Sequence, residues 1–427
     1  MKFSAFVLAT ALAAAGAHAD TPGAPPLPPP PLGLADVLRL AGSNFDVAVA
    51  RSGLDAARAD ILAADHAPLP QLTLKSSQMD LQHGLGPGNL FADKRIDKSV
   101  GVDWTWERGD KRALRTAAAR AAAEAAAGDM ADVRRQQLGL ALGASVDLAA
   151  AQQRVEEVAA LKRGADELIA AMRARHRAGD ISAQDLARAE IEASRAGIDL
   201  ASAGADRRRA SLALARLIGR GGDDIAIDAS AWPAPTDAPP LDDAQRAVLV
   251  ARRADVQAAE ARIQAAQAVL DGTLAARKSD VTWGVSVDHY PGTSNRLVEL
   301  RLQMPLQIGY AQQGETGRAR AQLQQARDLA DRTRLMAEAD LNQAALDLQA
   351  SARTLAVHET ELLPKARQVL AQAELAYRKG AMSLTDLVDA RRSLRTAVLD
   401  ALAARADHAR ATGAWALLTD PEFAKQP

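Results

Sequence analysis

The sequence predicts a mainly α protein with a small membrane β-barrel part, built from two tandem repeats. Three observations predict this fold class: abundant alanine, four short segments of alternating polarity, and an internal repeat of turn motifs. Of the 427 residues, 99 are alanine, and aromatic residues make up only 3%. Alanine has the highest helix propensity and lets helices approach closely. Long helices packed through small side chains are therefore expected, rather than the core of a globular enzyme.

Charge and motif content exclude several classes of protein. Lys and Arg number 52 against 53 Asp and Glu, for a net charge of -1, so no nucleic-acid partner is expected. The absence of cysteine excludes disulfide scaffolds and cysteine-based metal sites. The seven histidines do not pair at metal-ligand spacing, and no nucleophile elbow, P-loop, dinucleotide fingerprint or HExxH motif occurs. We therefore expect no catalytic residues, no cofactor and no bound metal.

Residues 1–19 are predicted to be a secretory signal peptide. Lys2 is the positive end, an apolar run follows, and Ala17-His18-Ala19 fits a signal-peptidase site. The alternative, a membrane anchor, is disfavoured because the apolar run is shorter than the ~20 residues needed to cross a bilayer. Residues 20–33 are Pro-rich and are expected to form an extended linker. Since no cysteine follows the signal peptide, a lipid anchor is not expected.

The first predicted repeat spans residues 34–219. It begins with a helix, followed by strands at about 72–80 and 99–106; in the second strand Val, Val, Trp and Trp alternate with smaller or polar residues. A helical hairpin follows over 113–218. Its first arm has no proline for about 65 residues, which at 1.5 Å per residue reaches on the order of 100 Å. Residues 220–242 read as an irregular connector.

The second predicted repeat spans residues 243–420 and has the same order of elements. A helix leads to strands at about 281–290 and 297–304, and a second long helical hairpin covers 317–418. Residues 421–427 form a C-terminal tail.

The strongest evidence for the repeat lies in the turns of the two hairpins. Gly179 and Gly380 occupy equivalent positions, 201 residues apart (380 − 179). A serine, an aspartate and a leucine follow each glycine at matching distances, which continues the repeat into the returning helix.

The four strands have the length and alternation of membrane-spanning strands, which need about 9–11 residues. Four strands cannot close a barrel, and an open edge is not tolerated in lipid. Three chains would supply 12 strands, and the helices would then project from one end and continue the barrel as a long α-helical barrel. Aromatic residues beside the strands suggest a membrane-interface belt, although ordinary strand propensity also accounts for them. The candidates for this belt are Trp104, Trp106, Trp283 and Tyr290.

The carboxylates after the two turns allow two interpretations. Asp185 and Asp386 each follow a serine by three residues, so they fit the capping of a returning helix. Asp389, on a neighbouring position of the same helix face, is not explained by capping. Around a symmetric tube these carboxylates would form rings, and such rings filter cations.

The residues resemble the TolC family of bacterial outer-membrane factors over essentially the whole mature chain. The dipeptide Leu363-Pro364, upstream of the second turn, is similar to the corresponding segment of many members of the family. Glu107–Arg112 resembles the corresponding segment of the cobalt–zinc–cadmium resistance branch, with Asp110 in place of one of its paired glycines. Where that branch has aromatic-Asp-Arg, this chain has Gln307-Ile308-Gly309. The main motif reads Tyr377-x-x-Gly380-x-x-Ser383-x-x-Asp386-Leu387-x-Asp389-Ala390.

This resemblance implies a homotrimeric channel in outer-membrane lipid, with most of its mass in the periplasm. It implies that the channel joins a periplasmic adaptor (a membrane fusion protein) and an inner-membrane pump of the RND type, and passes substrate without chemistry. The family pattern places Asp386 and Asp389 at the tip constriction, with Asp185 nearby. It also places four turn residues where adaptor hairpins bind: Arg177, Gly179, Arg378 and Gly380.

Several alternatives remain at this point. A soluble periplasmic coiled-coil adaptor would explain the helices but not the four amphipathic strands. Within the channel interpretation, heavy-metal export competes with export of drugs or organic solutes and with type I protein secretion. The sequence favours heavy-metal cations through its branch resemblance.

Overall fold

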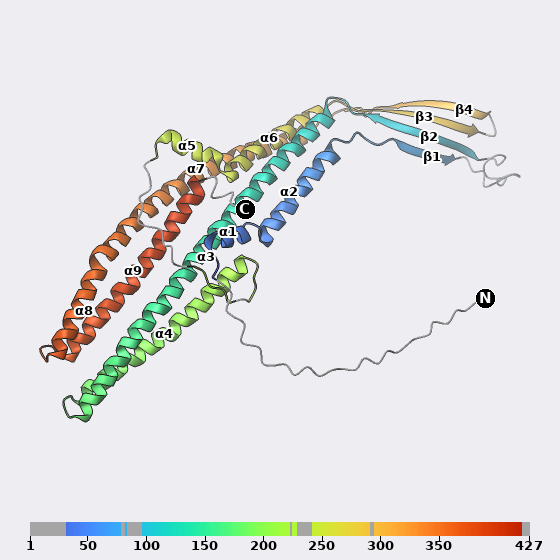
Figure 1. Ribbon diagram of the computed structural model, residues 1–427. Coiled ribbons are helices and arrows are strands. Elements are labelled where there is room, and N and C mark those ends of the chain that lie inside the picture. The colour runs from blue at the N-terminus through green and yellow to red at the C-terminus, as the bar shows by residue number, and fades with distance from the viewer. Residues whose placement is uncertain are drawn as a thin grey trace, which may run out of the picture.

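The computed structural model describes residues 31–77, 82, 96–222, 224–228, 241–290 and 294–420. The predicted signal peptide, residues 20–30 of the predicted linker, most of the predicted connector and the C-terminal tail lie outside these ranges. A sheet lies at one end of the molecule, and the turns of two long helical hairpins lie at the opposite end (Figure 1).

Helices make up most of the described chain. The longest, α3, has 67 residues and carries no proline, which is why it runs unbroken along the molecule (Figure 1). No helix in the described ranges is both long and apolar enough to cross a membrane. In chain order the helices are α1 (Leu34–Ala41), α2 (Phe45–Ala64), α3 (Lys111–Arg177), α4 (Ala183–Leu217), α5 (Asp243–Arg252), α6 (Ala254–Ala275), α7 (Gln313–Val357), α8 (Leu363–Arg378) and α9 (Leu384–Thr419).

Two helices that the sequence predicts as continuous are each broken once. The helix expected before the first strand divides at Asn44, whose side chain accepts a hydrogen bond from the Val47 N–H at 3.1 Å and so caps α2. The helix expected at the start of the second repeat divides at Arg253, because its guanidinium binds Asp255 at 2.7 Å and Asp340 at 3.0 Å. In both cases a side-chain contact outweighs local helix propensity.

The first arm of the second hairpin is also less regular than predicted. A π-helical segment, His358–Leu362, separates α7 from α8. Pro364 lies at the start of α8; it lacks an N–H, and its ring crowds the carbonyl four residues earlier. Widening the helix by one residue relieves this crowding, which explains why the π turn lies directly before the proline.

Within the described residues, four strands form one antiparallel sheet in the order β1-β2-β3-β4: β1 (Gln71–Ser77), β2 (Asp97–Trp106), β3 (Val281–Tyr290) and β4 (Ser294–Gln303). The central pair, β2 and β3, joins segments about 180 residues apart in sequence, with Trp104 opposite Trp283. Neither β1 nor β4 has a further strand beside it in the described part of the chain.

The two faces of this sheet differ in chemistry. On the polar face Arg301 forms an ion pair with Asp103, and Thr73 donates a hydrogen bond to the same carboxylate at 2.5 Å. The opposite face is apolar and exposed. It carries Leu72, Leu74, Val100, Val102, Trp104, Trp106, Trp283, Val285, Val287, Val298, Leu300 and Leu302.

The predicted linker ends in an ordered contact rather than a free segment. Leu32 pairs in parallel with Ile227: the Leu32 N–H donates to the Ala226 carbonyl at 2.9 Å, and the Asp228 N–H donates to the Leu32 carbonyl at 3.1 Å. Ile225 and Ile227 are buried in a core formed with α1, α3 and α4, so the described end of the connector is also part of the core. Burial of isoleucine therefore holds together two segments that sequence alone suggests are loose.

Candidate functional site

The turn between α3 and α4 is fixed by its backbone. Gly179 has φ of +84°, a conformation that residues with a Cβ rarely adopt, and its N–H donates to the His176 carbonyl at 3.0 Å. Ser182 then caps α4: its Oγ accepts from the Asp185 N–H at 3.1 Å and donates to the Asp185 carboxylate at 2.8 Å. Arg177 and Gly179 are exposed at this tip.

The turn between α8 and α9 has the same construction. Gly380 has φ of +73°, and its N–H donates to the Tyr377 carbonyl at 3.1 Å. Ser383 caps α9, accepting from the Asp386 N–H at 3.2 Å and donating to the Asp386 carboxylate at 2.8 Å. Arg378 and Gly380 are exposed, and an added Cβ at either tip glycine would meet nothing within 4 Å. The glycines thus serve backbone conformation, and the space around both turns is open.

The three acidic residues predicted near the constriction differ in their surroundings. Asp185 and Asp386 each bind the serine that caps their own helix, while Asp389 is exposed and lies 3.6 Å from Arg392. Within one protomer, the capping interpretation therefore accounts for Asp185 and Asp386 and leaves Asp389 unexplained.

The two tips pack against each other. Met172 of α3, Ala189 of α4 and Leu384 of α9 form one buried cluster. Above it, the Arg175 guanidinium lies 5.6 Å from the centre of the Tyr377 ring, at cation–π distance. These contacts place the two turns at one end of the molecule as a single surface.

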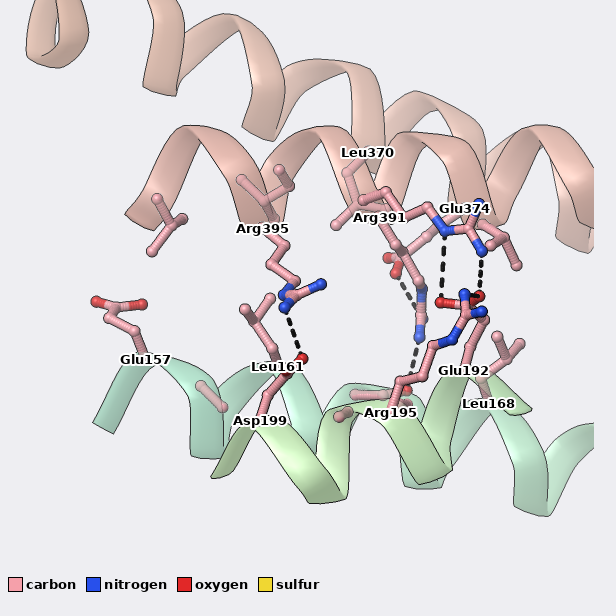
Figure 2. Close-up of a pocket in the computed structure, with 18 of the residues that line it drawn as sticks. Glu157, Leu161, Leu168, Glu192, Arg195, Asp199, Leu370, Glu374, Arg391 and Arg395 are labelled. Carbon is pink, nitrogen blue, oxygen red and sulfur yellow. Dashed lines mark hydrogen bonds and ion pairs between the residues drawn. The ribbon is translucent and has the colours of Figure 1, made fainter. Parts of the chain in front are cut away.

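Away from the tips, arginines of α9 hold the two hairpins together (Figure 2). Arg392 forms an ion pair with Glu192 of α4, and Arg395 binds Asp199 at 2.7 Å. Arg391 donates to the Gly164 carbonyl of α3 at 2.8 Å. We call these contacts the hairpin seam. They border a cavity of about 330 Å³, whose apolar lining includes Leu161, Leu168, Leu370 and Val398.

The hairpin seam was not foreseen from the sequence. Its signal in the sequence is opposite charge at nearly equivalent positions of the two returning helices. Glu192 stands ten residues after Ser182, and Arg392 stands nine residues after Ser383. The hydrogen bond from Arg392 holds the pKa of Glu192 below its ordinary value. The same hydrogen bond raises the pKa of Arg392, so the pair is ionised at neutral pH.

The aromatic residues predicted at a membrane interface lie on the sheet, but not all at one level. Trp104, Trp106 and Trp283 are exposed on the apolar face, and Trp104 and Trp106 lie toward the helical end of β2. Tyr290 lies at the opposite end of β3, where the pairing register shifts. In the described ranges, no group of three His, Cys, Asp or Glu side chains is arranged to hold a metal ion.

Comparisons with known proteins agree with this architecture. A family model described as "Outer membrane efflux protein" matches residues 39–220. The cobalt-zinc-cadmium resistance protein CzcC of Cupriavidus metallidurans is 27% identical over 385 residues, covering 85% of this chain and 84% of CzcC.

Solved structures of outer-membrane channels share the fold. CusC superimposes with a TM-score of 0.77 at 17% identity, covering 90% of this chain and 91% of CusC. The open state of MtrE from Neisseria gonorrhoeae superimposes with a TM-score of 0.76 at 18% identity, covering 90% of this chain and 88% of MtrE. OprN superimposes with a TM-score of 0.74 at 22% identity, covering 92% of this chain and 91% of OprN. The chain is therefore similar to outer membrane efflux proteins in sequence over residues 39–220, and it shares its fold with solved outer-membrane channels.

Proposed function

We propose that this chain is the outer-membrane duct of a tripartite export system for heavy-metal cations, and that three copies build it. The observation that carries the proposal is the sheet: one face is apolar and exposed, and its edge strands β1 and β4 have no neighbour among the described residues. Pairing β4 of one copy with β1 of the next removes both edges. Three copies then close 12 strands, an even number suited to a membrane barrel.

The order of elements supports the proposed tandem repeat. Each half supplies helices, two strands and a hairpin that ends in a glycine turn with a capping serine. In a closed trimer both hairpins would continue the barrel as a helical tube, with six glycine turns at its far end. Ala-rich helices suit this arrangement because small side chains allow close lateral packing.

At that end we propose Asp386 and Asp389 as the constriction, with Asp185 nearby. Support comes from the position of all three at the starts of helices beside exposed turns. Threefold symmetry would turn each carboxylate into a ring, which attracts cations and slows their passage.

We further propose that the exposed turns are the docking surface for the periplasmic adaptor. Arg177 and Arg378 each bend back to a carbonyl of their own helix at 3.3 Å, which leaves their guanidinium groups at the surface beside Gly179 and Gly380. Open backbone at the glycines suits close approach of a partner helix. The inner-membrane pump, of the RND type, would lie beyond this adaptor.

Heavy-metal cations are proposed as cargo because of the likeness to CzcC, a cobalt-zinc-cadmium resistance protein. Deleting the gene should lower tolerance to zinc, cobalt and cadmium, and restoring the gene should recover it. Unchanged metal tolerance together with sensitivity to an organic drug would overturn this cargo in favour of drug or organic-solute efflux.

The constriction is tested by single-channel recording of the purified full-length protein in planar bilayers. Replacing Asp386 and Asp389 by Asn should weaken block by a multivalent cation at least about tenfold, because six carboxylates leave the mouth. Asp328→Asn with Asp331→Asn on α7 is the matched control, since these exposed carboxylates are also three residues apart. Equal block in the parent and the Asp386/Asp389 variant would exclude the proposed constriction.

A further inference from the structure

Where the sheet meets the helices, three loops are joined into one structure. The Arg108 N–H and the Lys111 ammonium both donate to Asp280, at 2.9 and 2.7 Å. The Gln307 side chain donates to the Ala276 carbonyl at 2.9 Å. The stem of Lys278 lies across Gly109, where an added Cβ would come within 2.8 Å of it. The loops after β2, after α6 and after β4 therefore hold fixed positions.

An open groove of about 610 Å³ lies in this junction and includes Trp106, Arg108 and Lys278 in its lining. Trp106 is the last residue of the exposed apolar stripe on β2. Because residues of one strand face share a side of the sheet, the groove opens on the side that we assign to lipid. Beyond it, Leu306 and Ile308 are also exposed, Ile308 by 85%.

The charges in the groove leave two cations available. Lys111 is paired with Asp280, Arg112 with Asp65 and Glu107 with Arg115, so these charges are compensated within the protein. In the described part of the chain, neither Arg108 nor Lys278 has an acidic side chain within ion-pair distance; the guanidinium of Arg108 contacts only the Met304 sulfur, at 4.0 Å. Asp110 is the one uncompensated carboxylate in the described lining. The exposed Arg277, next to Lys278, adds further positive charge.

We propose that this groove binds the phosphate headgroup of an anionic phospholipid in the periplasmic leaflet of the outer membrane. Arg108 and Lys278 would bind the phosphate, and Trp106 would lie at the level of the ester groups, where aromatic side chains are favoured. The positive charge of the groove fits a phosphate, and its position next to the apolar face of the sheet fits acyl chains. A lipid is the occupant that has both. This inference rests on the proposed function, since it requires the sheet to lie in a membrane.

The test uses the full-length protein reconstituted into vesicles that contain brominated phosphatidylglycerol or brominated phosphatidylcholine. Quenching of tryptophan fluorescence then reports which lipid lies beside the strands. The parent protein should prefer phosphatidylglycerol. Each cation strengthens binding to an anionic membrane surface by about fivefold, so Arg108→Gln with Lys278→Gln should reduce the preference by about 25-fold. Arg332→Gln with Arg353→Gln, two exposed positions on α7, should leave it unchanged.

Two results would overturn the inference while leaving the channel intact. One is equal quenching by the two lipids in the parent protein; the other is an undiminished preference in the Arg108/Lys278 variant. Full competition by millimolar inorganic phosphate would also overturn it, because the groove would then take free phosphate rather than lipid. Failure of the parent protein to insert into vesicles and conduct ions would instead overturn the proposed function itself.

Discussion

Glu192 of α4 binds α9 directly. It accepts hydrogen bonds from Arg392 of the other hairpin and from Arg195 of its own helix, the latter at 3.0 Å. The pair with Arg392 is partly exposed, so solvent screens it, and its contribution to stability is on the order of 1 kcal/mol. The pair matters for the fold because it joins α4 to α9, at residues that lie 200 positions apart in the sequence.

Replacing Glu192 by Gln should lower the free energy of unfolding by about 1 kcal/mol at pH 7. The folded-state pKa of Glu192 lies below the unfolded value of about 4.3, so this stability is present above that pH and is lost as the pH falls through the folded pKa. Urea unfolding followed by circular dichroism should therefore show a difference between parent and variant at pH 7 that shrinks below about pH 4.

Glu190→Gln provides the control for this measurement. Glu190 binds Arg173 at 2.9 Å within one hairpin, so its loss should not loosen the contact between the hairpins. Hydrogen exchange in the first turns of α9 should accelerate in the Glu192 variant and not in the Glu190 variant. Equal exchange in both would show that the hairpin seam does not hold α9 in place.

At the scale of elements, α3 and α6 pack closely at Gly128 of α3. A Cβ on Gly128 would lie 2.7 Å from the Ala258 Cβ and 2.9 Å from the Ala254 carbonyl oxygen. Because the carbonyl belongs to the backbone of α6, the clash can be relieved only by moving one helix.

Gly128→Ala should consequently destabilise the protein by about 1–3 kcal/mol, even though alanine is the better helix former. Gly143→Ala, on the same helix with nothing within 4 Å of the added Cβ, should leave stability unchanged or raise it by up to about 1 kcal/mol. Thermal unfolding of the two variants side by side checks this; a Gly128 variant as stable as the parent would show that α3 and α6 are not so closely packed.

What sequence could predict at this scale depends on how local the cause is. Strands such as β3 were predictable because a period of two residues is visible within ten residues. The break at Asn44 was not, because its side chain also donates to Gln137 at 2.9 Å and to the Leu217 carbonyl at 3.2 Å. Gly380 and Ser383 were predictable as turn and cap because the pattern that identifies them lies within a few residues. The ion pairs of Arg392 and Arg395 were not predictable, because their partners lie about 200 residues away in the sequence.

At the scale of the whole molecule, the proposed membrane barrel would place the exposed apolar face of the sheet against lipid. Leu300 on β4 is 79% exposed and lies in the middle of its strand. Replacing it by Arg should cost about 2–4 kcal/mol of membrane stability if it lies near the bilayer midplane.

Leu300→Arg should therefore reduce the amount of protein recovered in the outer-membrane fraction, while Glu299→Gln, on the opposite face, should not. Immunoblots of fractionated cells, with extraction by salt and then by detergent, measure both. Normal recovery of the Leu300 variant in the pool that resists salt and is released by detergent would contradict a lipid-facing position for this residue.

The contact between Leu32 and Ile227 has a consequence for the order in which the molecule forms. The core that surrounds it draws every buried member from residues 37–227, namely Val37, Ala41, Ala141, Leu148, Ala149, Leu214, Ala215, Ile218, Ile225 and Ile227. Polypeptides emerge from their amino end, and domains generally fold as units in that order. The first hairpin can therefore close its own core once residue 228 has emerged, with nearly half the chain still to come. When the second half of the chain emerges, it would then pack against a first half that is already folded rather than against another unfolded segment.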